Sequence, residues 1–150
     1  MTENLLSKRT IALSGGYDPI HPGHIRLISA AKHFADNIII ILNSDAWLQK
    51  KHGVVFMPWD ERKEMLLAIK GVSSVIAVDD SDGTVCEALK QLKPNIFGNG
   101  GSMGARNTPE RKLCNELGIV CVWGLGGGEA NSYDTTKFQE FIQYLAKSAD

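Results

Sequence analysis

Five short apolar segments alternate with amphipathic segments along this 150-residue chain. The apolar segments are TIALSGG (10–16), NIIIILN (37–43), SSVIAVD (73–79), NIFGNG (95–100) and IVCVWG (119–124). Most are rich in β-branched residues, and each is a continuous run rather than an alternation of apolar and polar residues. Continuous runs of this length are typical of parallel strands that are covered on both faces. We therefore expect five strands in one parallel sheet.

The segments between these strands have helical spacing. Helices are expected over 22–35, 58–69, 86–92, 109–117 and 134–147. Pro22 and Pro58 stand at helix starts, where proline is favoured, and Gly118 follows a helix end, where glycine is common. Alternation of strands and helices implies right-handed crossovers with helices on both faces of the sheet. The prediction is an α/β fold, a Rossmann-like doubly wound five-stranded parallel sheet, in a single domain over 1–150.

The composition excludes several functional classes. A formal net charge of -1 and a pI near 6.4 provide no basic field for binding nucleic acid. There is no run of about 18 apolar residues that could span a membrane, and the first residues lack a secretory signal. We therefore expect a cytoplasmic protein. Cys86, Cys114 and Cys121 form no CxxC pair, which predicts reduced structural thiols rather than disulfides or a zinc ribbon.

Three glycine-rich segments follow expected strands, at 14–24, 98–104 and 124–132. Ligands of doubly wound sheets bind beyond the carboxyl ends of the strands, so these segments predict one cleft. In the first segment, SGGYDPIHPGH, Gly15 and Gly16 allow a sharp bend and let a ligand lie against the main chain.

The same segment places His21 and His24 at the start of an expected helix. Residues three apart lie on the same side of the first turn, and Gly23 between them leaves the cleft open. A helix N-terminus attracts anions, so the pair predicts a phosphate site. Asp18 either caps the following turn or supports the site electrostatically.

GGYDPIHPGH (15–24) resembles the G-x-F-D-x-x-H-x-G-H signature of the cytidylyltransferase-like nucleotidyltransferases, with Tyr17 in place of Phe. This family shares its HxGH element with class I aminoacyl-tRNA synthetases. It includes glycerol-3-phosphate cytidylyltransferase and the adenylyltransferase domain of ADP-heptose synthase. The resemblance continues through NSDAWLQKKHG (43–53), PWDERKEML (58–66), PNIFGNGGS (94–102) and NSYDTTKF (131–138).

The resemblance implies transfer of CMP or AMP from CTP or ATP to a small phosphorylated sugar or polyol, with release of pyrophosphate. It implies His21, His24 and Lys51 as catalytic residues. It implies nucleotide contacts from Gly15, Gly16, Tyr17, Asp18, Gly23, Arg62, Asn99, Gly100, Gly101, Thr135 and Thr136. Mg²⁺ would be carried on the triphosphate rather than in a protein site, and the family also implies a homodimer.

Three departures from the family pattern leave the base and the acceptor open. Ser102 stands where many relatives have Asp, no Arg precedes Thr135, and Asp134 replaces a serine. From the residues alone, Lys51 also fits a solvated lysine in a charged loop, and Arg62 fits a surface pair with acidic neighbours.

Other functional classes remain as alternatives. A non-catalytic nucleotide sensor on the same fold is the main one. A zinc site at His21 and His24 lacks a third ligand nearby. GGYDPIHPG does not fit the G-x-G-x-x-G spacing of dinucleotide-dependent oxidoreductases.

Overall fold

The five expected strands form one sheet. A computed structural model describes residues 8–101, 107–127, 140, 143–145 and 147. Within it the strands are β1 (Thr10–Gly15), β2 (Asn37–Leu42), β3 (Val72–Ile76), β4 (Ile96–Gly98) and β5 (Val120–Val122). All neighbours pair in parallel, in the order β3-β2-β1-β4-β5. The predicted Rossmann-like doubly wound sheet is confirmed.

The strand order reverses at β1, because β2 and β3 lie on one side of it and β4 and β5 on the other. Two loops leave the sheet at this point, one after Gly15 and one after Gly98. The crevice between two such loops is where open α/β sheets bind ligands. The fold therefore brings the segments after the first and fourth strands to the same edge.

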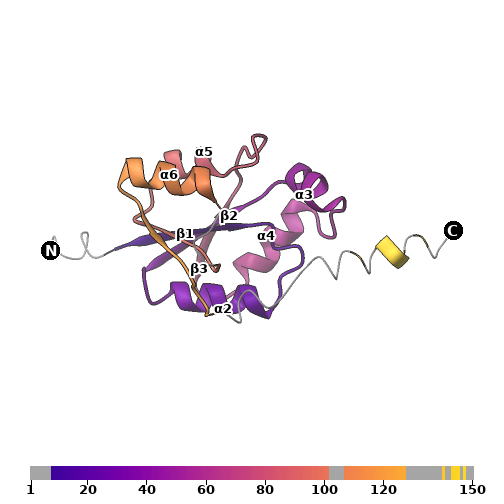
Figure 1. Ribbon diagram of the computed structural model, residues 1–150. Helices are drawn as coiled ribbons and strands as arrows, with labels where there is room; N and C mark the ends of the chain where they lie inside the picture. The colour runs from indigo at the N-terminus through magenta and orange to yellow at the C-terminus, as the bar shows by residue number, and fades with distance from the viewer. Residues whose placement is uncertain (1–7, 102–106, 128–139, 141–142, 146, 148–150) are drawn as a thin grey trace.

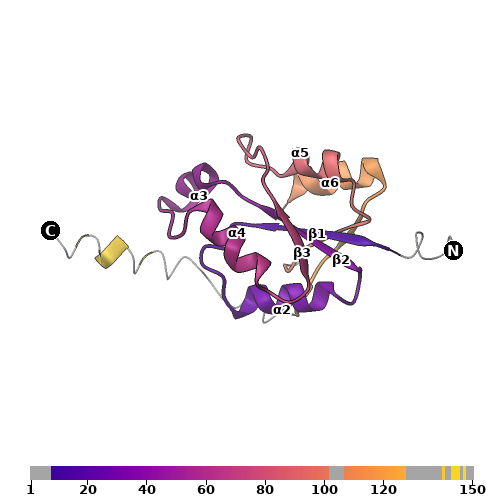
Figure 2. The same cartoon turned by 180° about the vertical axis from the view of Figure 1, so that it is seen from behind.

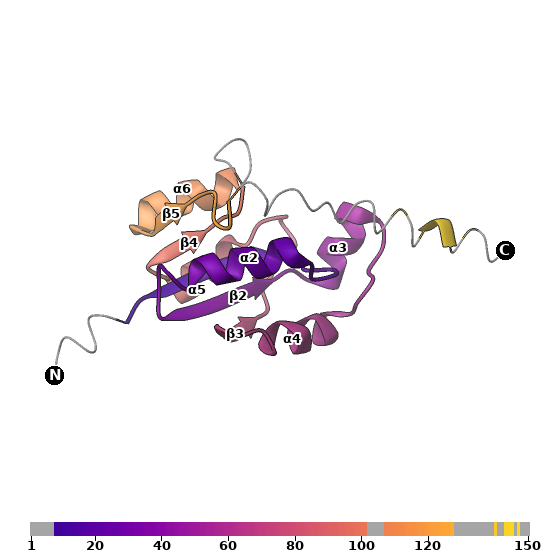
Figure 3. The same ribbon diagram turned by 90° about the horizontal axis from the view of Figure 1, so that it is seen from below.

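Helices cover both faces of the sheet. They are α2 (Pro22–Ala31), α3 (Asp45–His52), α4 (Trp59–Leu67), α5 (Cys86–Leu92) and α6 (Thr108–Leu117). In Figure 1, α5 and α6 lie above the sheet and α2 and α4 below it, and the reverse view in Figure 2 shows the same layers. Figure 3 shows α3 at the end of the sheet rather than on a face. None of the helices described is long and apolar enough to cross a membrane.

The two faces of the sheet carry separate cores, and β1 contributes to both. Ile11 and Leu13 pack on the side of α2 and α4, whereas Ala12 packs on the side of α5 and α6. Successive side chains of a strand point to opposite faces, so a strand buried on both sides must be apolar at every position. This explains the continuous apolar runs in the sequence.

One helix was not expected. No helix is expected over 43–53, and a charged loop is only the alternative setting of Lys51, but this segment contains α3. Ser44 caps this helix by accepting a hydrogen bond from the Trp47 amide at 3.0 Å, and Gly53 ends it with φ 79°. Leu48 is its one buried residue, so α3 has no apolar periodicity to reveal it.

Several element ends also differ from expectation. The helix expected over 22–35 ends at Ala31, because the next amides, of His33 and Phe34, bond three residues back rather than four. The strands expected over 95–100 and 119–124 are each three residues long. The helix expected over 134–147 falls largely outside the described residues.

Candidate active site

The two signature histidines lie together at the start of α2. His21 is the N-cap residue and His24 is in the first turn. Their rings stack with centroids 3.8 Å apart and planes 18° from parallel. The backbone N–H of His21 donates to Nδ1 of His24 at 3.2 Å. The spacing predicted this pairing on one side of the helix.

The surroundings of both imidazoles favour the neutral form. Burial, followed by repulsion between the two rings when both are protonated, lowers the pKa of His24 to about 3. Burial also lowers the pKa of His21. Because Nδ1 of His24 accepts a hydrogen bond, the proton of the neutral ring is on Nε2. His24 can therefore donate a hydrogen bond to an anion without first being protonated.

An open hollow of about 490 Å³ adjoins His21. It is lined by His21 together with Ile20, Pro22, Ile25 and Arg26. The hollow lies at the N-terminus of α2, where the helix dipole favours a negative charge. A phosphate group in this hollow would therefore lie beside His21 and the helix end, with His24 stacked behind His21.

Packing, rather than backbone conformation, restricts the glycines before this pair. A Cβ on Gly16 would lie 2.7 Å from Cδ2 of Leu48, and a Cβ on Gly15 would lie 3.0 Å from the Tyr17 ring. The close approach is thus to the protein's own side chains. The Tyr17 ring is buried 4.5 Å from the His24 ring, and its backbone φ is 50°. Tyr17 supports His24 from the core side.

Asp18 ties the signature loop (16–21) to a distant segment. Its buried carboxylate accepts hydrogen bonds from the amides of Phe56 and Met57, each at 2.7 Å. Neither bond caps the turn that follows Asp18, although capping that turn is one of the two roles expected for this residue. Asp18 instead fixes the chain between α3 and α4 against the signature loop.

Arg62 has no exposed surface, and its guanidinium is used within the protein. Its nitrogens donate to the carbonyls of Met57 (2.9 Å), Gly16 (2.8 Å) and Asn43 (2.8 Å), and to Oδ1 of Asp45 (2.6 Å). The prediction of direct contact with a triphosphate or second substrate is therefore corrected. Arg62 joins the ends of β1 and β2 to the start of α3.

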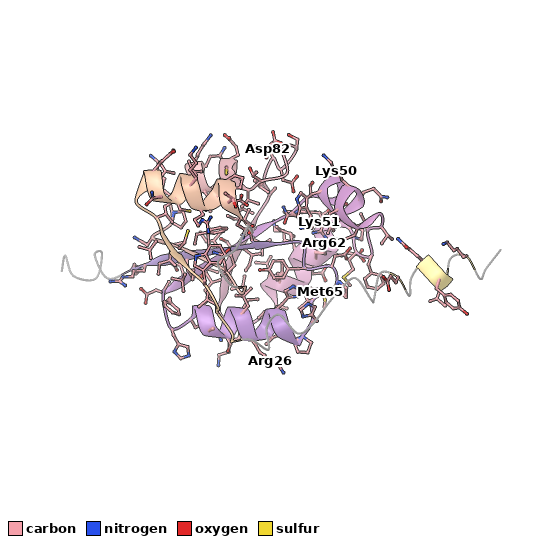
Figure 4. All side chains as sticks on the ribbon, viewed as in Figure 1. Arg26, Lys50, Lys51, Arg62, Met65 and Asp82 are labelled. Carbon is pink, nitrogen blue, oxygen red and sulfur yellow. The ribbon has the colours of Figure 1, made fainter. Side chains whose placement is uncertain are left out.

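Lys51 lies on α3, with its Nζ 4.7 Å from the centroid of the Trp47 ring. Lys50 and Lys51 line a hollow of about 550 Å³ between α3 and the loop after β3. In Figure 4 these two lysines project from α3, whereas Arg26 lies on α2 below the sheet. The lining of this hollow does not include the histidines, so the structure places Lys51 in a separate hollow rather than against them.

Asp80 is a site residue that the sequence reasoning missed. Its buried carboxylate accepts from Nδ2 of Asn43 (3.0 Å) and from the amide and hydroxyl of Ser44 (2.9 and 2.6 Å). Because Ser44 caps α3, Asp80 fixes the start of that helix. The signal was present: a carboxylate just after an apolar run lies at the ligand-binding edge of a parallel sheet.

Asn99 follows β4 and is also used within the protein. Its backbone N–H donates to the Val122 carbonyl (2.8 Å). Its side-chain Oδ1 accepts from Nδ2 of Asn107 (2.7 Å). The Gly101 carbonyl accepts from the Gly124 amide at 2.9 Å. These bonds hold the loops after β4 and β5 together beside the site.

Of the remaining residues expected to contact the nucleotide, some lie in the described part of the chain and others do not. Gly23 is buried between the two histidines, and Gly100 lies in the loop after β4. Thr135 and Thr136 lie outside the described residues, as do Ser102 and Asp134.

Residues 12–122 match the protein family described as Cytidylyltransferase-like. The chain belongs to this family, and the resemblance drawn from GGYDPIHPGH is confirmed. The match begins within β1 and ends at the last residue of β5, so it includes residues of all five strands.

Two relatives illustrate the similarity. The chain is 34% identical over 110 residues to bifunctional protein HldE of Streptomyces coelicolor, covering 72% of this chain and 23% of that protein. It is 31% identical over 107 residues to FAD synthase of Archaeoglobus profundus, covering 71% and 65%. The chain thus spans about a quarter of the HldE protein and less than two thirds of the FAD synthase.

A solved structure shares the fold. The crystal structure of a lipopolysaccharide core biosynthesis protein from Thermoplasma volcanium superposes with a TM-score of 0.63 at 20% identity. The similarity covers 77% of this chain and 94% of that one. At this level of identity it supports the doubly wound architecture alone.

Proposed function

We propose that the protein is a nucleotidyltransferase that moves CMP or AMP from a nucleoside triphosphate to a small phosphorylated sugar or polyol. The observation that carries the proposal is the stacked, neutral His21–His24 pair at the start of α2. It lies at the switch point of the sheet, in a chain of the cytidylyltransferase-like family. Relatives named HldE and FAD synthase support transfer to a phosphorylated acceptor.

In the proposed reaction, a phosphate oxygen of the acceptor attacks the α-phosphorus and pyrophosphate leaves. The attacking oxygen is already an anion, so no general base is needed. Catalysis then depends on in-line positioning and on donors that meet the charge developing on the phosphorus oxygens. Nε2 of His24 is one such donor, and His21 and the helix N-terminus lie beside it.

We assign the nucleotide to the hollow beside His21 and the acceptor to the hollow beside α3. In the second hollow, Lys50 and Lys51 would meet the acceptor phosphate and the triphosphate, and the Trp47 ring forms an apolar wall. Trp47 also approaches the signature loop, because a Cβ on Gly16 would lie 3.5 Å from its ring. Thr135 and Thr136 would contribute donors to the β- and γ-phosphates.

Mg²⁺ is proposed to enter with the triphosphate. In the part of the chain that the structure describes, no three His, Cys, Asp or Glu side chains are placed to hold a metal ion. Mg²⁺ favours phosphate oxygens and water over an all-protein cage, so it would screen the phosphate charge without protein ligands. We assign no step of the reaction to it.

A pyrophosphate-release screen tests the proposal. CTP and ATP are each combined with a panel of phosphorylated sugars and polyols, in the presence of Mg²⁺. Release that depends on both substrates supports transfer, and the productive pair identifies base and acceptor. Tight nucleotide binding with no release across the panel would favour the nucleotide-sensor alternative instead.

The family also suggests a homodimer, which we include in the proposal. Light scattering on the purified chain, after size-exclusion chromatography, measures its mass directly. A monomer at all concentrations would remove this part of the proposal and leave the reaction unaffected.

A further inference from the structure

All three cysteines gather on the face of the sheet opposite α2. Cys86 begins α5, Cys114 lies in α6 and Cys121 is the central residue of β5. Cys114 is fully buried, and Cys121 packs against the same apolar cluster. The Cys121 thiol is a hydrogen-bond partner of Cys114, and Cys86 is near enough to act on Cys114 electrostatically. The sequence gives no sign of this cluster, because the three positions form no motif.

Cys121 differs from Cys114 in its access to solvent. It is half-buried and lines an open hollow of about 400 Å³ on the outer edge of the sheet. The other lining residues are Thr108, Arg111, Lys112, Asn115 and Ile119. Four of these occupy one stripe of α6 at helical spacing, so the wall facing the thiol is polar and basic.

We propose that this hollow admits an anionic low-molecular-weight disulfide and that Cys121 is the site of thiolation, with Cys114 as the resolving thiol. Reactive cysteines are found where a thiol is partly exposed beside cationic side chains, and Arg111 and Lys112 provide that setting. A cavity of this size is in the range that takes small molecules. None of these residues belongs to the proposed transfer site.

The chemistry is two thiol–disulfide exchanges. The Cys121 thiolate attacks one sulfur of the disulfide, an S–S bond breaks, and one thiolate leaves and takes up the proton that Cys121 lost. Cys114 then attacks the Cys121 sulfur of the mixed disulfide, expelling the second thiolate. The two protein thiols are oxidised to one disulfide, and the small disulfide is reduced to two thiols.

The order of these steps follows from burial. Cys114 has no exposed surface, so the external disulfide meets Cys121 first. Burial also raises the pKa of the Cys114 thiol, which lowers its thiolate fraction and slows the second exchange. A mixed disulfide at Cys121 should therefore accumulate before the protein disulfide forms. Cys86 does not line the hollow and takes no part in the scheme.

The test uses the full chain, reduced and then exposed to oxidised glutathione, with samples alkylated over time and measured by mass spectrometry. We expect one glutathionyl adduct on Cys121, followed by its conversion to a Cys114–Cys121 disulfide. Cys121→Ala should form no early adduct, and Cys86→Ala should react as the parent does. In Cys114→Ala the adduct should persist. Should that variant fail to fold, peptide mapping of the parent chain identifies the linkage directly.

A charge reversal tests the hollow itself. Lys112→Glu should slow the reaction with oxidised glutathione, which is net negative, roughly tenfold at low salt. The same variant should slow the reaction with the neutral hydroxyethyl disulfide much less, because only the effect on the thiolate remains. Lys70→Glu, at an exposed position between α4 and β3, is the matched control and should change neither rate. First reaction at Cys86, reaction only in denaturant, or equal slowing with both probes would overturn the proposal.

Discussion

Two sets of charged side chains lie within a short distance of the signature loop, and they are used in opposite ways. The inner layer (Asp18, Arg62 and Asp80) is buried and bonded to other parts of the protein, mainly its backbone. The outer surface (Lys50 and Lys51) faces a hollow, which Asp80 also lines with its bonded carboxylate. The inner layer fixes the positions of loops, and the outer surface remains available for a ligand. Charge in a motif therefore does not by itself identify a binding residue.

Removal of Arg62 should produce the largest effect. Arg62→Met leaves three carbonyl groups without their donor, so we expect the free energy of unfolding to fall by about 3–5 kcal/mol. Urea denaturation measures the change. Lys63→Met, on the same helix and over the Trp59 ring, should cost about 1 kcal/mol or less. Equal losses of stability in the two variants would mean that the buried Arg62 contributes no more to stability than a partly exposed lysine.

His24 lies between the two sets, because it is half-buried and, in the proposed reaction, its Nε2–H donates to the ligand. His24→Ala should lower the rate of nucleotidyl transfer by about 10²–10³, the effect of losing one preorganised donor. The variant should stay folded, as checked by circular dichroism. Near-normal turnover in a folded variant would remove His24 from the catalytic residues.

Acid should lower the stability of the folded protein by protonating His24. The pKa of His24 is about 3 in the folded protein, against an ordinary value of 6.5, so the unfolded state binds the proton first as pH falls. Stability from this group is complete above pH 6.5 and is lost toward pH 3. At about 1.4 kcal/mol per pH unit, the loss by pH 5 is about 2 kcal/mol.

Thermal or urea unfolding from pH 7.5 to 5 measures this slope. The matched variant is His24→Asn, which cannot titrate in this range and should show a shallower dependence. Parallel slopes for the two proteins would mean that other groups cause the acid sensitivity.

Lys51 belongs to the outer surface, so its removal should affect ligands and spare the fold. Lys51→Ala should raise the KM of a phosphorylated substrate about tenfold, since a partly exposed charge contact is worth about 1–1.5 kcal/mol. Its melting temperature should match that of the parent. Lys70→Ala serves as the control for loss of one positive charge. A large drop in stability in Lys51→Ala would place this lysine with the inner layer.

Tyr17→Phe should give the smallest change in this series, and it should stabilise the protein rather than destabilise it. The Tyr17 hydroxyl is buried with no hydrogen-bond partner among the described residues, and burial raises the pKa of the phenol. Tyr17→Phe removes this unsatisfied group and keeps the ring against His24, so stability should rise by about 1 kcal/mol. A loss of stability on urea denaturation would indicate that the hydroxyl has a partner.

The fold was predictable because its strands are buried on both faces and leave a clear pattern. The five strands and four of the helices could be read from apolar runs and helical spacing, and the pairing of His21 with His24 followed from their spacing. The helix α3 was not predicted, because only Leu48 is buried and the segment has no apolar periodicity. The cap at Ser44 and the glycine at Gly53 are the signals that mark its two ends.

The roles of Arg62 and Asn99 were not predictable for a different reason. Each is held partly by groups from other segments of the chain, and a motif does not say whether a polar side chain faces a ligand or the backbone. For Arg62 the partners lie 5 to 46 residues away. The geometry of the sheet edge, rather than the identity of the residue, decides the outcome.

The hydrogen bond between the His21 amide and His24 has a consequence for the timing of recognition. The imidazole of His24 cannot flip without losing that hydrogen bond, so its Nε2–H keeps one orientation. Folding, and not the arrival of a ligand, therefore sets the direction of the donor. Little reorientation of this ring should remain when a phosphate enters, and an environment oriented in advance costs no reorganisation during the reaction.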